Sequence, residues 1–233
     1  MSTTLAFLGE FGEAIDYILH SRESQAGGAE VGGSELLPLL WTHLEVSGAA
    51  MAIAIAVALP AGLALGHSGR GAFLTISVSN VGRAVPSIAL IAFFVAFFPS
   101  TPEFWNVTVA LALLAIPPIL TNAYVGVRQV SRDAVDAARG MGMSGGQIVR
   151  RVELPLALPE IMAGLRIAMT TTVGLASLAF LAGAGGLGEA LFADIAFRSN
   201  VVVAGGLAIL LAVVLDLLIL ALQKTITPWL RAA

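Results

Sequence analysis

Long apolar stretches, separated by short polar segments, make up most of the chain. Four of them have about the 20 residues that an α-helix needs to cross the hydrocarbon core of a bilayer. Because lipid cannot satisfy exposed backbone groups, each stretch is predicted to be a transmembrane helix. The four stretches are residues 46–66, 107–127, 164–186 and 201–222.

A fifth apolar stretch, residues 72–98, is interrupted by Arg83 and Pro86. As one helix it would reach about 40 Å, longer than a hydrocarbon core of roughly 30 Å, whereas neither half alone would cross. We predict one span that is tilted or kinked near Pro86; residues 72–82 lying along the membrane interface are the open alternative. The pattern therefore predicts an all-α membrane protein with about five spans.

The composition agrees with a membrane protein. Hydrophobic residues make up 58% of the 233 positions and charged residues 12%, with a mean hydropathy of +0.91, whereas soluble domains carry about 25% charged residues. A soluble enzyme, a disordered chain and a nucleic-acid binder are therefore disfavoured. The chain has no cysteine, and Lys224, its only lysine, follows no glycine loop, which excludes thiolate chemistry, Cys-ligated metals and a Walker A site for ATP. We accordingly assign no catalytic residue, metal ligand or cofactor to this chain.

The basic residues fall mostly on one side of the predicted spans. Basic residues that flank spans mark the cytoplasmic side, and five spans place nine of them on the side of the C-terminus, against Arg22 and Arg198 on the other. We therefore predict an external N-terminal arm (residues 1–45), a transmembrane domain (46–222) and a cytoplasmic tail (223–233). The nine are Arg70, Arg128, Arg132, Arg139, Arg150, Arg151, Arg166, Lys224 and Arg231.

The predicted arm carries no chemical signature. Apolar residues between Leu5 and Leu19 recur at helical spacing, which predicts a short amphipathic helix on the membrane surface. Residues 24–34 contain four glycines and are predicted to be a flexible link. A positioning role is the simplest interpretation of both pieces.

One long loop, residues 128–163, lies between the third and fourth predicted spans on the cytoplasmic side. It contains Asp136, Ala137 and Ala138, then Gly142, and, after nine intervening residues, the sequence Val-Glu-Leu-Pro at 152–155. This spacing predicts a helix with a small-residue face, a turn that glycine permits, a second short helix, and a stop at Pro155. A short, basic, rigidly turned element suits docking into a groove on a partner protein.

The loop resembles the hallmark of the permease subunits of binding-protein-dependent ABC importers, which is E-A-A, three residues, G, nine residues, then I-x-L-P. Asp stands for Glu and Val for Ile in this chain, and both changes keep charge or shape. The resemblance implies the fold of methionine-importer-like permeases, with this cytoplasmic loop as the element that couples the membrane helices to an ATPase. The matching residues are Asp136, Ala137, Ala138, Gly142, Val152, Leu154 and Pro155.

Three further segments, residues 42–47, 83–90 and 183–188, resemble the osmoprotectant branch of this family, which imports glycine betaine, carnitine, choline and similar quaternary ammonium solutes. Methionine-type permeases share the coupling loop and similar glycine-rich stretches, so methionine or another small solute stays open. The resemblance implies a multi-pass protein in the plasma membrane of a prokaryote, surrounded by lipid. Its implied partners are ATPase subunits that bind the ATP, a second copy of the permease or a similar permease, and a separate external solute-binding protein.

Two other classes are weighed against the permease. A secondary transporter driven by ions would need no ATPase, but such folds usually carry inverted repeats and paired broken helices, and the sequence shows neither. A membrane-embedded enzyme would need a cluster of His, Cys, Asp or Glu at membrane depth, and the sequence shows none.

Individual residues within the spans suggest local roles. Arg83 and Asp216 are ionisable at membrane depth, where such residues usually face a cavity or one another. Both are candidates for lining or gating a solute path; the alternatives are a snorkelling Arg83 and a helix-packing Asp216. Residues 183–188 fit G-x-G-x-x-G, but they end a span on the external side, so helix termination and close packing are predicted instead of a nucleotide site.

Overall fold

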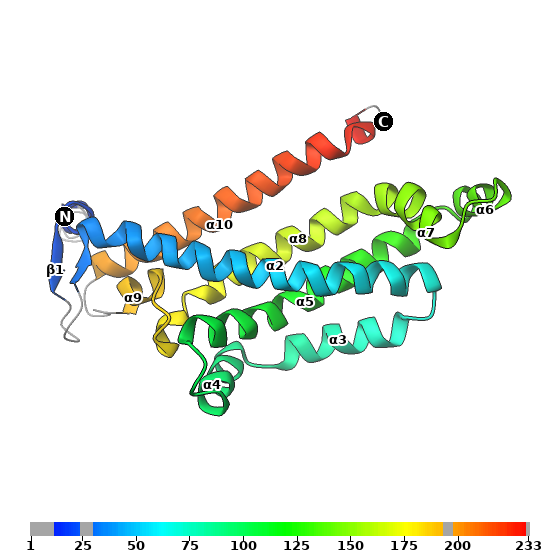
Figure 1. Cartoon of the computed structure of the whole chain (residues 1–233). Helices are drawn as coiled ribbons and strands as arrows, with labels where there is room; N and C mark the ends of the chain where they lie inside the picture. Colours follow the sequence, from blue (N-terminus) through cyan, green and yellow to red (C-terminus); the bar gives the residue numbers. More distant parts are fainter. Residues whose placement is uncertain (1–11, 24–29, 193–197, 232–233) are drawn as a thin grey trace, which may run out of the picture. The chain divides into compact units, whose positions relative to one another are not determined.

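The computed structural model describes residues 12–23, 30–192 and 198–231, which form helices, one pair of short strands and connecting turns (Figure 1). The predicted all-α class is confirmed. Short 3-10 helices η1 (Gly33–Glu35), η3 (Ala179–Ala182) and η4 (Pro228–Arg231) and the π-helical segment η2 (Val149–Glu153) join the longer elements. The α-helices are α2 (Leu36–Ser68), α3 (Ala72–Ala84), α4 (Ser87–Phe97), α5 (Glu103–Gln129), α6 (Arg132–Gly140), α7 (Gly145–Ile148), α8 (Leu154–Ala176), α9 (Leu187–Phe192) and α10 (Arg198–Ile226).

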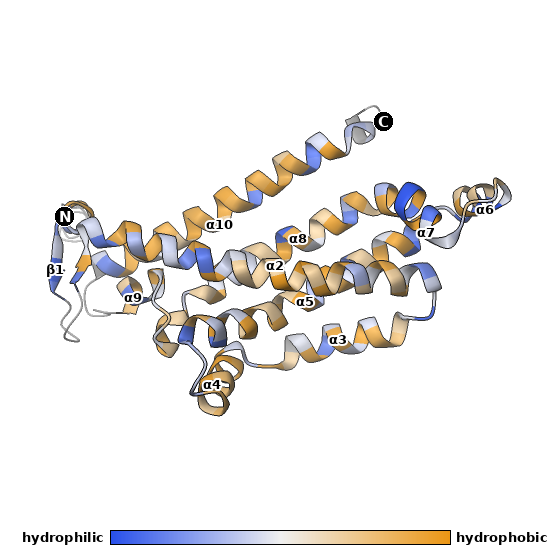
Figure 2. Cartoon of the chain, in the orientation of Figure 1, coloured by the Kyte–Doolittle hydropathy of each residue, from blue (hydrophilic) through white to orange (hydrophobic). Residues whose placement is uncertain are grey.

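Among the described residues, three helices are long and apolar enough to cross a membrane: Gly33–Ser68, Glu103–Gln129 and Ser199–Ile226. Each of the three contains one of the predicted spans. Figure 2 shows hydrophobic residues along almost the full length of α10. The broken pair α3 and α4 adds a fourth if it counts as one span. The break lies at Val85, whose extended backbone (φ −76°, ψ 120°) is the conformation that a following proline imposes. The kink predicted near Pro86 is therefore confirmed, while the count of five spans stays a prediction.

The predicted span 164–186 has the wrong boundaries, because its helix is shifted toward the N-terminus. α8 begins at Leu154 and ends at Ala176. At that end the turn tightens, since Leu178 N–H donates to Leu175 O at 2.9 Å, and the chain continues into η3. Residues 154–163 were predicted to belong to the loop but are the first ten residues of α8. They continue the helical stretch that begins at Gly145.

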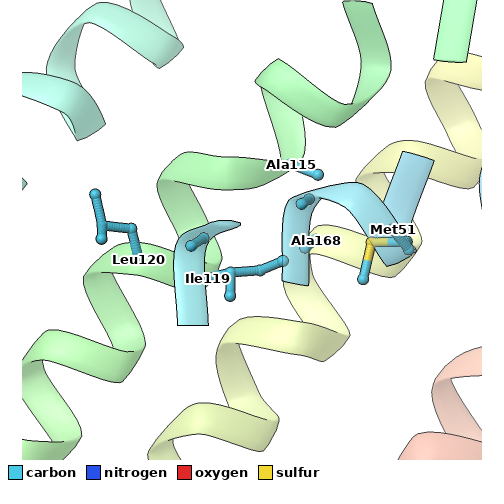
Figure 3. Close-up of a cluster of buried hydrophobic side chains, with 7 residues drawn as sticks. Met51, Ala115, Ile119, Leu120 and Ala168 are labelled. Carbon is cyan, nitrogen blue, oxygen red and sulfur yellow. The ribbon is translucent and has the colours of Figure 1, made fainter. Parts of the chain in front are cut away.

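The chain divides into two compact units. Unit 1 comprises residues 1–49, 87–111 and 173–213, and unit 2 comprises 50–86, 112–172 and 214–233. The main core of unit 2 joins residues of α2, α5 and α8, and most of its members are small (Figure 3). Small residues let helix backbones approach closely where lipid supplies no hydrophobic drive for association. The buried members are Met51, Ala54, Ala58, Ala115, Ile119, Leu120 and Ala168.

Glycines bring the helices of unit 2 even closer. A Cβ on Gly62 would lie 2.6 Å from Ala123 Cβ, and one on Gly164 would lie 2.5 Å from Asn122 Cβ. Both distances are too short for a methyl group, so α5 packs tightly against both α2 and α8.

Unit 1 holds the N-terminal arm in place through a buried tyrosine. Residues 12–19 are helical, as predicted, with Tyr17 1% exposed in a core with Val31 and Ala204. Strands β1 (Ser21–Glu23) and β2 (Glu30–Gly32) pair in antiparallel fashion, so the predicted flexible link at 24–34 is wrong where it includes β2 and η1; residues 24–29 lie outside the described part. Arg22 lies 4.9 Å from the Tyr17 ring and donates a hydrogen bond to Asn200 Oδ1. Residues 1–11, where the predicted amphipathic helix would begin, lie outside the described residues.

Candidate functional site

The segment of residues 128–163, here called the coupling segment, begins with an amphipathic helix. In α6, Val135 and Ala138 are buried and form an apolar cluster with Val130 and Ile148. Asp136 and Ala137 are exposed on the other side. The two alanines of the matched motif therefore have different roles. Ala138 packs in the apolar cluster, whereas Ala137 is a small exposed residue beside Asp136.

Gly142 ends α6 in a Schellman motif. Its φ is +81°, and Gly142 N–H donates to Arg139 O at 3.0 Å while Met143 N–H donates to Ala138 O at 3.2 Å. These two bonds satisfy the last carbonyls of the helix and need a left-handed residue at this position. The glycine turn predicted from the sequence is confirmed. Met141 lies at its tip and is 72% exposed.

From Gly145 onward the coupling segment is helical without a break as far as Ala176. Ser144 is the N-cap of α7, and its N–H donates to Gln147 Oε1 at 2.8 Å. It passes through η2, where Leu154 N–H donates to Val149 O, and then into α8. The stop predicted at Pro155 is wrong: Pro155 is the second residue of α8. The wider turn of η2 immediately precedes it, so the missing proline N–H and the bulk of its ring fall where an α-helical ladder is already interrupted.

Val152 and Leu154, the other motif residues here, both face apolar clusters. Val152 packs against the cluster of Val135 and Ile148. Leu154 packs against a second cluster, with Val127 of α5 and Ile161 of α8. The motif residues at 152 and 154 thus fasten the start of α8 to the end of α5 and to α6.

Glu153, the unspecified position of that motif, is 5% exposed and lies against the last turn of α2. Its Oε2 accepts a hydrogen bond from His67 Nδ1 at 2.7 Å. The pair borders a cavity of about 70 Å³ whose wall includes Arg128, Arg132 and Arg139. Neither residue was predicted as part of a site, because His67 and Glu153 lie 86 positions apart and no spacing rule connects them.

Asp216 forms an ion pair that joins α10 to α8. Arg166 Nε donates to Asp216 Oδ1 and Arg166 Nη2 to Asp216 Oδ2, each at 2.7 Å. Such parallel bonds fix both the distance and the orientation of the two groups. The hydropathy pattern predicted Asp216 at membrane depth but left Arg166 on the cytoplasmic flank. Arg83 lies in α3, and its side chain is outside the described part of the structure.

The glycine-rich segment 183–188 forms a tight turn between η3 and α9. Gly183, Gly185 and Gly186 have φ values of +75°, +73° and +89°. A Cβ on Gly188 would lie 1.8 Å from Ser177 O. The predicted close packing is confirmed at Gly188. Gly183 is the C-cap of the short helix η3, whereas α8, the helix of the predicted span, already ends at Ala176. Next to this turn, His43 Nε2 hydrogen-bonds Val173 O at 2.9 Å, which joins α2 to α8 within unit 1.

No group of three or more His, Asp or Glu side chains among the described residues could hold a metal ion. The geometry of the coupling segment instead suits the transmission of motion. The exposed helix α6 and the turn at Gly142 lead through α7 and η2 into the long helix α8. The family of proteins described as binding-protein-dependent transport system inner membrane components matches residues 47–232. The chain belongs to this permease family.

Relatives of this permease cover most of its length. It is 34% identical over 203 residues to the glycine betaine/carnitine/choline transport system permease protein OpuCB of Bacillus subtilis, covering 85% of this chain and 92% of the relative. It is 36% identical over 200 residues to the carnitine transport permease protein OpuCB of Listeria monocytogenes (84% and 90%). It is 33% identical over 200 residues to the osmoprotectant import permease protein OsmY of Salmonella typhimurium (83% of each chain).

The fold of this permease is similar to that of the MetNI methionine ABC transporter in an inward-facing conformation. The TM-score is 0.69 at 26% identity, covering 83% of this chain and 94% of the other. The chain is therefore a multi-pass inner-membrane permease of an ABC importer and a non-catalytic subunit. Its family membership implies an ATPase and a solute-binding protein as partners.

Proposed function

We propose that this permease imports a small compatible solute of the quaternary ammonium class, such as glycine betaine, carnitine or choline. The observation that carries this proposal is what the names of relatives say, each covering more than four fifths of the chain: two name carnitine, one of them together with glycine betaine and choline, and the third names osmoprotectants. The methionine transporter resembles the chain in fold at lower identity, 26%. Methionine is therefore the second candidate solute.

We also propose that the coupling segment docks on the ATPase at the cytoplasmic side, with the N-terminus outside and the C-terminus inside. Three features support docking: the exposed Asp136 and Ala137, the Schellman turn at Gly142, and the exposed Met141 at its tip. Helical structure then runs from Gly145 to Ala176. A displacement of the docked turn would pass along this helix because its backbone bonds resist bending. Val152, Leu154 and Pro155 act at its start, where they fix its packing.

The path itself is proposed to form between two permeases, either two copies or this chain and a similar one. About five helices are too few to enclose a path, and only 17% of the apolar window of α10 is buried within the chain. That exposed surface suits lipid or a second permease. Arg83 and Asp216 are proposed to line or gate the path, with Asp216 held by Arg166. In this scheme an external binding protein delivers the solute, ATP binding turns the path outward, and hydrolysis resets it.

The test is uptake into vesicles that contain this permease with the ATPase and binding protein encoded beside it. Labelled glycine betaine, carnitine, choline and methionine are offered in turn, with and without ATP. Saturable, ATP-dependent uptake of a quaternary ammonium solute, with methionine excluded, is the expected result. ATP-dependent uptake of methionine alone would reassign the solute, and uptake that ignores ATP would favour an ion-driven transporter.

A further inference from the structure

The coupling segment is attached to unit 2 by a side-chain bond as well as by α8. Glu153 is a carboxylate at 5% exposure, and burial of such a group is costly unless it is hydrogen-bonded. Its described partner is His67, through Nδ1 at 2.7 Å. Because a carboxylate can only accept, His67 must carry its proton on Nδ1. The bond therefore fixes η2 against the end of α2.

The His67 ring is confined on its opposite edge too. A Cβ on Gly145 would lie 3.2 Å from His67 Nε2, so the first residue of α7 approaches the ring closely. The last turn of α2 thus meets the coupling segment at two places, one at each end of the stretch 145–153. Arg128, in the last turn of α5, lines the same small cavity as the pair. Residues of α2, α5 and the coupling segment therefore share the wall of this cavity.

The anchored stretch is the least regular part of the helix. η2 has π-type hydrogen bonding over five residues, and short π segments inside α-helices often occur at functional sites. A wide turn of this kind gives way more easily than a regular helix, so motion arriving from α6 could be absorbed here. The hydrogen bond from His67 of α2 to Glu153 holds the wide turn and limits that loss.

We infer that His67 and Glu153 are a positioning pair that transmits displacement of the coupling segment to α2 as well as to α8. This inference rests on the proposed function. With the bond intact, α2 and α8 move together when the ATPase displaces α6 and α7. With the bond broken, the segment still docks, and ATP is still hydrolysed, but α2 follows the motion less well. The quantity that changes is therefore the number of solute molecules imported per ATP hydrolysed.

The experiment measures uptake and ATP hydrolysis together in vesicles that contain the full transporter. The variants are His67→Ala, Glu153→Ala, the double variant and Glu153→Gln. Either alanine variant is expected to lower uptake per ATP on the order of tenfold, a normal size for coupling between sites. The double variant should lose no more than one single variant, because paired residues are not additive. Glu153→Gln keeps an oxygen that accepts from Nδ1 and should retain most of the ratio.

The matched control is His20→Ala. His20 forms the same kind of bond, Nδ1 to Asp16 Oδ1 at 2.9 Å, but both side chains are about 70% exposed (71% and 68%) and lie in the N-terminal arm. This variant should keep the wild-type ratio. A wild-type ratio in both alanine variants, or single losses that multiply in the double variant, overturns the inference.

Two further outcomes separate the inference from the proposed function. If the wild-type transporter shows no ATP-dependent uptake, the proposed function fails and the inference fails with it. If wild-type uptake needs ATP but the His67 and Glu153 variants import as much solute per ATP as the wild type, only the inference fails. Should Glu153→Ala not assemble, His67→Ala decides alone, since the His67 side chain is 30% exposed and its removal leaves a smaller void.

Discussion

Gly140 and Gly142 lie two residues apart, and an added Cβ would meet no atom within 4 Å at either position. They differ in backbone conformation: Gly142 has a φ of +81°, whereas Gly140 ends α6 without a positive φ. Gly142→Ala is expected to cost about 1–2 kcal/mol, because an L-residue in the left-handed region is strained. The Schellman turn then opens and ATP-dependent uptake falls.

Gly140→Ala is the control for this prediction, because alanine favours a helical backbone and is expected to be neutral or stabilising there. Uptake and the thermal midpoint of the assembled transporter are measured for both variants. Equal behaviour of the two would mean that the left-handed turn at Gly142 is not needed.

The Arg166–Asp216 pair supplies a second prediction at this scale. Asp216→Asn leaves the guanidinium without its carboxylate and is expected to destabilise the helix pair by about 1.5–3 kcal/mol, the range for hydrogen bonds to charged groups. Uptake should slow while the transporter still assembles. Uptake rate and thermal midpoint are measured for Asp216→Asn, for Arg166→Gln and for the double variant, in which two neutral side chains can hydrogen-bond.

The double variant separates packing from a role in the path. If it restores both stability and uptake, the pair only ties α8 to α10. If it restores stability but not uptake, the charges themselves act on the solute path. Wild-type uptake in the single variant Asp216→Asn would remove Asp216 from the path altogether.

At the scale of elements, η2 holds one residue more than a regular helical turn, since Leu154 N–H donates to Val149 O. Deleting the exposed Arg150 turns this bond into an ordinary α-helical bond and leaves Val149 and Ile148 close to their present positions. Ile148 should then keep its cluster with Val135 and Ala138. Because a regular helix gives way less easily than a wide turn, uptake per ATP is expected to stay at the wild-type value or rise, and Arg150→Ala, which keeps the length, should match the wild type. A sharp fall in the deletion variant alone would show that the π turn itself is needed for coupling.

The elements also show which features can be predicted from the sequence. The spans within α2, α5 and α10 were predictable because apolar length is a local property. The Gly142 turn was predictable because a left-handed residue after a helix favours glycine. The start of α8 was not, because Pro155 and Pro159 are typical helix breakers, yet both lie within α8, which follows the π turn directly. β1 and β2 have three residues each, too few for an alternating pattern.

The long-range pairs were beyond prediction for a different reason. His67 with Glu153, and Arg166 with Asp216, are joined by helix packing over 86 and 50 positions. The residues next to each member of these pairs in the sequence do not indicate which residue it contacts. Asp216 could be noticed because an acid in an apolar stretch is unusual, but its partner depended on where α8 begins.

At the scale of the whole molecule, the number of spans determines which side each terminus occupies. Three helices among the described residues qualify by length and composition, and the broken α3–α4 pair makes a fourth. A crossing by α8 as well gives five, an odd number, and places the N- and C-termini on opposite sides. The concentration of arginine between residues 128 and 151 then falls on the cytoplasmic side, in keeping with the positive-inside rule.

Because the chain contains no cysteine, single cysteines report this topology without background. Ser21, Ser144 and Thr225 are all exposed, and each is replaced by cysteine in a separate variant. With five spans, Ser21→Cys reacts with a membrane-impermeant maleimide in cells whose inner membrane is intact, while Ser144→Cys and Thr225→Cys react only after that membrane is permeabilised. An even number of spans would give Ser21→Cys and Thr225→Cys the same accessibility. Labelling of Ser144→Cys from outside would place the coupling segment on the wrong side for any ATPase, and the docking proposal would fall with the topology.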